Sequence, residues 1–336
     1  MGRVSTEPAP TPARSAGAAT VLARSRGELA VALADAPDPR AVVMTMGALH
    51  EGHFDLVREA ARRVGPAGTV VVTIFVNPLQ FAPTEDLDSY PRDLEGDLAG
   101  LTRTLTGVDG ALSVGQLVVF APTPEVIYPA GQPAVRIDPG PIATVLEGRT
   151  RPTHFAGVCQ VVLTLMHLTA PRWALFGRKD AQQLAIIESM VRDLAVPLEI
   201  VPVDIRRESD GLAMSSRNAY LSPEQRRQAL ALSRALQAGR DAAAQAAGSG
   251  TRLDPAAIRR AALASLEAAD GVEIDYVALV DPAGFEDLTD AGLGLPRRAP
   301  VHEDAGEGLP AVGLLAVAVR VGTTRLIDNT LIDLHP

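Results

Sequence analysis

The sequence has few cysteines, few aromatic residues and no long apolar run. Its 336 residues include one cysteine, Cys159, and one tryptophan. A single cysteine excludes an internal disulfide and a zinc site built from several thiolates, which is typical of a protein from a reducing cytoplasm. The apolar run "VVVTIFV" at 70–76 is interrupted by Thr73 and is far too short to cross a bilayer. We therefore expect a cytoplasmic protein with no membrane partner.

Positive charge is also scarce. The chain has 31 Lys and Arg residues against 40 Asp and Glu residues, which gives a formal net charge of −9. Nonspecific affinity for nucleic acid comes mostly from basic patches, so this balance argues against a nucleic-acid partner. Any phosphate ligand should be small and held by a local group of residues.

The first part of the chain alternates apolar segments with helical patterns. The segments "AVVMTM", "TVVVTIFV", "QLVVFAP", "RWALFG" and "LEIVPVDI" read as strands, and the residues at 54–64 and 180–194 repeat apolar positions at helical spacing. Continuous apolar strands between amphipathic helices predict an α/β fold, a Rossmann-like doubly wound parallel sheet. We expect this domain to span residues 21–205.

The pattern changes after residue 206. Two helices are expected at 222–247 and 254–269, and they are followed by three strand candidates. This order predicts a second, smaller α+β domain over 206–336 that closes over the active site. Residues 1–20 are rich in Pro, Ala and Ser and are expected to form a disordered tail.

The stretch "MTMGALHEGH" at 44–53 is the first candidate site. His50 and His53 would lie one turn apart at the start of a helix, where backbone N–H groups carry a partial positive charge of about +0.5. Gly47 and Gly52 would let a phosphate approach the backbone. An isolated H-x-x-H is more often a pair of solvated histidines, and its spacing does not suit a zinc site.

Three further stretches carry polar groups at expected strand ends. "LFGRKDAQQ" places Lys179 and Asp180 after a strand, "DGLAMSSRN" ends on Ser215–Asn218, and "FVNPLQF" offers Asn77 and Gln80. Each alone could be an ordinary turn. Because the carboxyl ends of parallel strands meet at one edge of a sheet, the four stretches together indicate nucleotide chemistry.

These residues resemble a known family. The blocks "MGALHEGH", "FVNPLQF", "YPRDLEGD", "RPTHFAGV", "FGRKDAQQ", "DGLAMSSRN" and "RVGTTRLIDN" are similar, in this order, to those of the pantothenate synthetase (pantoate–β-alanine ligase) family, whose superfamily is marked by a HIGH-like motif. The resemblance runs from about residue 20 to the C-terminus. It implies a homodimeric ligase that forms pantoyl adenylate from pantoate, ATP and Mg²⁺, then passes the pantoyl group to β-alanine and releases AMP.

The resemblance also assigns roles to residues. It implies that His50, His53, Lys179 and Arg217 are catalytic, with His53 as the proton donor, and that Thr45, Gln80 and Gln183 hold pantoate and β-alanine. Asp97 is the one acidic residue left where some members have several, so it is the expected Mg²⁺ contact. The ATP-binding residues implied are Met46, Gly47, Ala48, Leu49, His50, Glu51, Gly52, His53, Gly177, Arg178, Lys179, Asp180, Arg206, Met214, Ser215, Ser216 and Arg217.

Two positions depart from the family pattern. Arg178 stands where the family often has Glu, and Arg206 stands where it often has Val. We interpret both as positions at which the backbone matters more than the side chain, and therefore expect activity to survive.

Two other functions stay open at this point. One is a related HIGH-motif nucleotidyltransferase, such as a cytidylyltransferase or a tRNA-charging enzyme; the acidic balance disfavours the tRNA version. The other is a catalytically silent nucleotide-binding protein, which would have no chemical need for both histidines, the lysine and the Ser-Ser-Arg group.

Overall fold

The computed structural model describes residues 19–81, 87, 90–107, 110–249, 253–289, 295 and 310–335. Of the expected tail, Ala19 and Thr20 begin a strand, and the other residues lie outside the described part. Most of 289–310, a stretch rich in Gly, Pro and charged residues for which the sequence predicts an exposed loop, also lies outside it. None of the described helices is long and apolar enough to span a membrane.

Six parallel strands form the larger sheet. They are β1 (Ala19–Ala23), β2 (Arg40–Thr45), β3 (Thr69–Ile74), β4 (Gln116–Phe120), β5 (Trp173–Gly177) and β6 (Glu199–Val203), in the spatial order β1-β4-β3-β2-β5-β6. The sequence predicts every strand of this sheet except β1, whose first two residues belong to the segment expected to form the tail. Its main helices are α1 (Arg26–Ala34), α2 (Glu51–Val64), α3 (Leu94–Leu105), α6 (His154–Thr169) and α7 (Ala181–Asp193), with the short helices α4 (Pro124–Ile127) and α5 (Glu147–Thr150).

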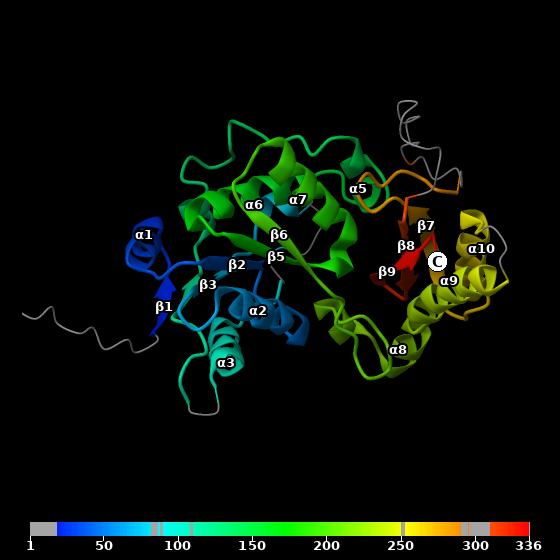
Figure 1. Cartoon of the computed structure of the whole chain (residues 1–336), viewed down its shortest axis with the longest axis horizontal. Coiled ribbons are helices and arrows are strands. Elements are labelled where there is room, and N and C mark those ends of the chain that lie inside the picture. Colours follow the sequence, from blue (N-terminus) through cyan, green and yellow to red (C-terminus); the bar gives the residue numbers. More distant parts are fainter. Residues whose placement is uncertain are drawn as a thin grey trace, which may run out of the picture.

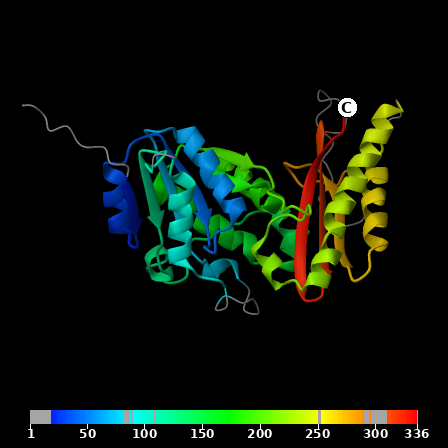
Figure 2. The ribbon, with the colours of Figure 1, turned by 90° about the horizontal axis from the view of Figure 1, so that it is seen from below.

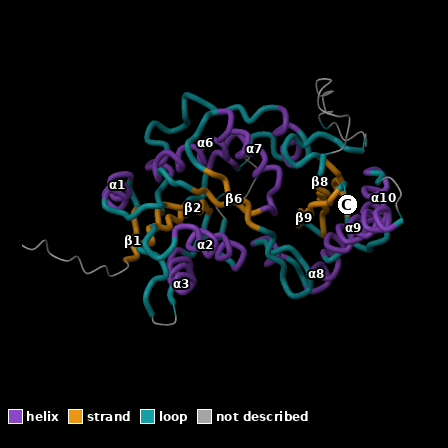
Figure 3. The backbone as a smooth tube through the Cα atoms, in the orientation of Figure 1, coloured by secondary structure: helices purple, strands orange, loops and turns teal. Residues whose placement is uncertain are grey.

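Helices cover both faces of this sheet. Successive residues of a strand point to opposite faces, so Val42 packs in one core with α1, α6 and α7, while Ala41 and Val43 pack in another with α2 and α3. Figures 1 and 3 show the strands between these two layers of helices. The doubly wound parallel fold predicted from the sequence is confirmed. We call this sheet, its helices and their connections the first lobe.

The second lobe contains a smaller, antiparallel sheet of strands β7 (Glu273–Val280), β8 (Val312–Val321) and β9 (Thr324–Asp333). Its helices are α8 (Pro223–Ala229), α9 (Ala231–Gly248) and α10 (Pro255–Glu267). The single helix expected at 222–247 is therefore divided at Leu230 into α8 and α9. The expected domain boundary at 205–206 falls in the connection that follows β6.

Both faces of the second sheet are buried. Leu315, Val317 and Val319 pack against α9 and α10 on one face. On the other face, Ala316 and Ala318 join a core with residues of the first lobe. Figure 2 shows the sheet standing between the two helices and the first lobe. This shared core fixes how the lobes meet, and the site lies beside it.

Candidate active site

The site lies where the chain reverses direction across the first sheet. From β2 the chain runs outward through β3 and β4, and from β5 it runs the other way to β6, so that β2 and β5 are neighbours. Ligands of open α/β sheets bind at such a switch point, outside the carboxyl ends of the strands. Here β2 ends at Thr45, just before the two histidines, and β5 ends at Gly177, just before Lys179.

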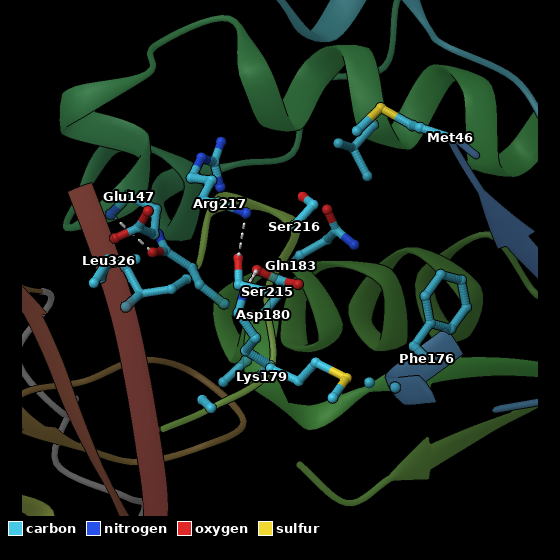
Figure 4. A pocket seen from close by; sticks show the side chains of 18 of the residues that line it. Met46, Glu147, Phe176, Lys179, Asp180, Gln183, Ser215, Ser216, Arg217 and Leu326 are labelled. Atoms are coloured by element: carbon cyan, nitrogen blue, oxygen red, sulfur yellow. Dashed lines mark hydrogen bonds and ion pairs between the residues drawn. The ribbon is translucent and has the colours of Figure 1, made fainter. Parts of the chain in front are cut away.

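A cavity of about 840 Å³ opens at this point and is lined by residues of both lobes. Figure 4 shows Lys179 and Asp180 beside the Ser215–Arg217 segment, with Glu147 and Leu326 at one side. Most of the expected site residues line it: Thr45, Met46, His50, Gly52, His53, Gln80, Gly177, Lys179, Asp180, Gln183, Arg206, Met214, Ser215, Ser216 and Arg217. The structure therefore brings the four candidate stretches together.

The remaining expected residues, Gly47, Ala48, Leu49, Glu51, Arg178 and Asp97, are not among those that line the cavity. Glu51 directs its carboxylate to Arg58 at 2.9 Å, and Arg178 pairs with Asp204 at 3.2 Å. The side chains of Glu51 and Arg178 are thus paired within the protein, and their contact with ATP stays a prediction.

The two histidines cap the helix that carries them. Nδ1 of His50 accepts a hydrogen bond from the Gly52 N–H at 3.2 Å, and Nδ1 of His53 accepts one from the His50 N–H at 3.3 Å. A nitrogen that accepts carries no proton, so a neutral ring in this position must carry its proton on Nε2. Both residues line the cavity and their ring centroids lie 4.1 Å apart. The helix start therefore sets both tautomers, leaving two N–H donors for a ligand.

Burial keeps both imidazoles neutral. It lowers the pKa of His53 to about 3, and the neighbouring His50 adds to this effect. The pKa of His50 is also lowered, first by burial and then by the charge of Lys179. In the free protein at neutral pH, both rings are thus hydrogen-bond donors without a net charge.

Asp97 fixes the turn between β2 and α2 and does not face the cavity. Its carboxylate accepts hydrogen bonds from the Ala48 N–H at 3.0 Å and from the Leu49 N–H at 2.7 Å. Gly47 and Ala48 both have positive φ, 88° and 51°, so the turn needs such support. The residue is 4% exposed. Both carboxylate oxygens already hold this backbone, which favours a structural role for Asp97, and the Mg²⁺ contact stays a prediction.

Lys179 and Asp180 form an ion pair directly after β5. The Nζ–Oδ1 distance is 3.3 Å. Burial acts to raise the pKa of Asp180, but the charge and hydrogen bond of Lys179, together with the charges of Arg217 and His154, outweigh it and the pKa is lowered. The carboxylate therefore stays ionised and can accept hydrogen bonds from hydroxyl groups of a ligand.

Ser215 begins the short helix that carries Arg217. The Ser215 hydroxyl accepts the Arg217 N–H at 3.3 Å. The preceding segment is held by a hydrogen bond from the Met214 N–H to the Arg206 carbonyl at 2.9 Å. Arg206 also pairs with Asp55 through its side chain at 3.3 Å. This arrangement places two hydroxyl groups and a guanidinium at the cavity edge.

The end of β3 supplies the amides. Gln80 donates to the Met46 sulfur at 2.9 Å and accepts from Asn77 at 3.2 Å, and Asn77 in turn accepts from the Tyr128 hydroxyl at 3.0 Å. Thr45 donates its hydroxyl hydrogen to the Thr73 carbonyl at 2.8 Å, so it can offer a ligand only a lone pair. Gln80 is therefore held in one orientation before a substrate arrives.

Several cavity residues were given no role from the sequence. His154 Nδ1 and Arg151 Nη2 both lie within 3.3 Å of the Gln80 carbonyl. Tyr276 and Arg325 come from the second lobe. The blocks "RPTHFAGV" and "RVGTTRLIDN" contain three of these four residues and were the available signal, but the sequence does not show that they face the same cavity.

Comparison with known proteins agrees with this geometry. The profile of the family described as pantoate-beta-alanine ligase matches residues 23–331. The chain belongs to this family. It is therefore an enzyme, a pantoate–β-alanine ligase that uses ATP to form pantothenate.

Individual members of the ligase family are similar over most of the chain. A pantothenate synthetase from a Nocardioides species is 49% identical over 317 residues, which is 93% of this chain and 85% of that protein. Pantothenate synthetase 4 from Frankia alni is 53% identical over 290 residues, covering 86% of this chain and 82% of that one.

Solved structures of family members share the fold. The pantothenate synthetase from Thermus thermophilus has a TM-score of 0.76 at 40% identity and covers 94% of this chain and 100% of that one. The pantoate-beta-alanine ligase from Francisella tularensis, solved with beta-gamma ATP and beta-alanine, has a TM-score of 0.65 at 27% identity, covering 93% and 98%.

Proposed function

We propose that the cavity between the lobes performs the ligation in two steps through pantoyl adenylate. In the first step, a carboxylate oxygen of pantoate bonds to the α-phosphorus of ATP while the bond to the bridging oxygen breaks and pyrophosphate leaves. In the second step, the amine of β-alanine bonds to the acyl carbon, loses a proton, and displaces AMP. The products are pantothenate, AMP and pyrophosphate.

One observation carries this proposal. His50, His53 and Lys179, together with Arg217 from a different loop, line a single cavity. A carboxylate that attacks a phosphate brings two anions together, and negative charge then moves onto the leaving pyrophosphate. Donors already aimed at this charge stabilise the transition state without reorganising. We assign the two Nε2–H groups, the ammonium and the guanidinium to the phosphates.

The other assignments follow the layout of the cavity. Asp180, kept ionised, would accept hydrogen bonds from the ribose hydroxyls. Gln80 and Gln183 would hold pantoate, whose carboxylate then lies beside the α-phosphate. His53, neutral in the free enzyme, acts as a hydrogen-bond donor, and the proton-donor role implied by the family resemblance requires ATP to raise its pKa first.

The second step needs little acid or base chemistry, because an acyl adenylate is already activated. Holding both reactants in one cavity can contribute roughly 7–11 kcal/mol. Residues of both lobes line the cavity, so the two lobes together limit the access of water to the adenylate.

Mg²⁺ is expected with ATP, but the described part of the chain offers no preformed site for it. Among the described residues, no group of three His, Cys, Asp or Glu side chains could hold a metal ion. Mg²⁺ commonly binds through substrate phosphates and water with few protein ligands. We therefore assign no residue and no reaction step to the ion.

We also propose that the enzyme is a cytoplasmic homodimer. The family resemblance supports the dimer, and the buried thiol of Cys159 suits a reducing compartment. Sedimentation equilibrium should give about twice the 35.2 kDa chain mass.

Pyrophosphate exchange into ATP tests the proposed function. Exchange should require pantoate and should not require β-alanine, because the first step is complete without the amine. Exchange that proceeds without pantoate, or only with CTP or tRNA, would assign the cavity to a different nucleotidyltransferase. Binding of ATP with no exchange under any of these conditions would indicate a silent nucleotide-binding protein.

A further inference from the structure

Asn329 lies on β9 of the second lobe and contacts the turn at Arg178–Asp180 of the first lobe, which carries Lys179. Its side-chain Nδ2 donates to the Arg178 carbonyl at 2.9 Å and to the Lys179 carbonyl at 2.8 Å. The residue is 5% exposed, so water cannot easily replace these bonds. We propose that Asn329 is a positioning residue, which holds Lys179 in its phosphate-binding place when the lobes are docked.

The two hydrogen bonds act on the backbone of one short turn. Residues 178–180 form a single 3-10 turn, which starts at Gly177 without a side-chain cap. An amide NH₂ group has two hydrogens, and here they bind two successive carbonyls of that turn. Fixing both peptide units fixes the direction in which the Lys179 side chain leaves the backbone.

The neighbouring residue on β9 holds the arginine segment. Asp328 forms a two-pronged ion pair with Arg207, with distances of 2.7 and 3.0 Å. Arg207 makes a β-bridge with Ala213, two residues before Ser215, and also donates to the Gly211 carbonyl at 3.1 Å. The side chain of Asp328 is 1% exposed. It therefore supports the segment that carries Arg217.

Adjacent residues of a strand point to opposite faces. Asn329 is paired with Ala316, on the face toward the first lobe, and Asp328 is paired with Val317, on the face toward α9 and α10. The Asp328 carboxylate also accepts the Asn329 N–H at 2.8 Å. Asp328 and Asn329 thus link the segment that carries Arg217 to the turn that carries Lys179. Docking of β9 therefore completes the phosphate site.

This inference rests on the proposed function, which assigns Lys179 to the ATP phosphates. If Asn329 acts through Lys179, then its effect on adenylation should disappear once Lys179 is removed. A role in general stability would instead lower activity by the same factor whether or not Lys179 is present. A double-mutant cycle separates the two cases.

The test uses Asn329→Asp, which keeps the size of the side chain but replaces both donors with a carboxylate facing two carbonyls. We expect kcat/KM for ATP in pantoate-dependent pyrophosphate exchange to fall by about 30-fold or more, the equivalent of two lost hydrogen bonds. In a Lys179→Ala background the same change should lower it by less than about threefold. Thr330→Val is the matched control, because Thr330 follows on β9 and bonds Arg240 instead.

Three results would decide against the proposal. If Asn329→Asp lowered kcat/KM for ATP by the same factor in the two backgrounds, or did not lower it in the parent, the positioning role alone would be overturned. An unchanged Lys179→Ala single variant would reject the phosphate assignment of the proposed function, and this inference with it. If thermal unfolding shows that Asn329→Asp does not fold, Asn329→Ser, which keeps one donor, replaces it in the same cycle.

Discussion

Glu147 and Arg325 come from different lobes and form a two-pronged ion pair at the wall of the cavity. The two N–O distances are 2.6 and 2.7 Å, and each side chain is 15% exposed. Tyr276 donates its hydroxyl to Glu147 at 2.8 Å, and Arg325 also donates to Asp275 at 2.8 Å. The first and second lobes are thus joined by a network of charged groups beside their shared apolar core.

Replacing Arg325 tests what this network contributes to stability. Arg325→Leu removes a cation that bonds two carboxylates, Glu147 and Asp275. We expect the free energy of unfolding to fall by about 3 kcal/mol, because unpaired charges are then left partly buried. Urea denaturation measures the change. The exposed Arg192, paired with Asp193, is the control, and Arg192→Leu should cost less than about 0.5 kcal/mol. Equal losses at the two positions would contradict this prediction.

The depressed pKa of His53 predicts a loss of stability in mild acid. An unfolded histidine takes up a proton near pH 6.5, whereas the folded His53 stays neutral down to about pH 3. As the pH falls below 6.5, the unfolded state gains a proton that the folded state does not, so unfolding becomes easier. Between pH 7 and pH 5 we expect His53 to account for about 2 kcal/mol of lost stability.

Urea denaturation at the two pH values checks this, with His53→Gln as the comparison, because glutamine does not titrate. The difference between pH 7 and pH 5 should shrink by about that amount in the variant. An identical pH difference in parent and variant would show that His53 is not buried in its neutral form.

Asp97→Asn distinguishes support of the turn from metal binding. The asparagine amide keeps the shape of the carboxylate, but its NH₂ group would face the backbone N–H of Ala48 or Leu49 and lose that hydrogen bond. Because the turn before the two histidines is then less well held, we expect adenylation to slow by about tenfold. The Mg²⁺ concentration for half-maximal rate should stay the same. Asp93→Asn is the matched control. Asp93 caps α3, the helix that carries Asp97, through a side-chain oxygen that asparagine retains. A raised Mg²⁺ requirement at unchanged maximal rate would restore Asp97 as a metal ligand.

Much of the fold could be predicted because local pattern and global layout agree. The apolar runs of β2 and β5 are buried on both faces, which is why they read as continuous rather than alternating. The four candidate stretches were expected at one sheet edge and the structure places them around one cavity. At the departures Arg178 and Arg206, the backbone carbonyl accepts a structural hydrogen bond, which supports the interpretation that the backbone matters there.

The sequence could not show contacts between lobes. Asn329 and Arg325 are far along the chain from their partners Lys179 and Glu147, and nothing in the local pattern of β9 predicts which carbonyl or carboxylate they meet. The hydrogen bonds of Asp97 could not be predicted for a related reason. An acidic residue near a phosphate site suggests a metal ligand. The partners of Asp97 are instead the backbone N–H groups of Ala48 and Leu49, in a turn where Gly47 and Ala48 have positive φ.

The small sheet is apolar on both faces, and this limits how the protein can be divided. Cutting the chain after β6 would expose Val280, Leu314 and Ala316 to water, together with the Asn329 side chain that now bonds the carbonyls of Arg178 and Lys179. Such a fragment would present an exposed apolar surface, which favours aggregation. The C-terminal portion therefore fits the apolar surface around Val145, Leu146 and Ala185 of the first lobe, and grafting it onto an unrelated enzyme would require a matching surface.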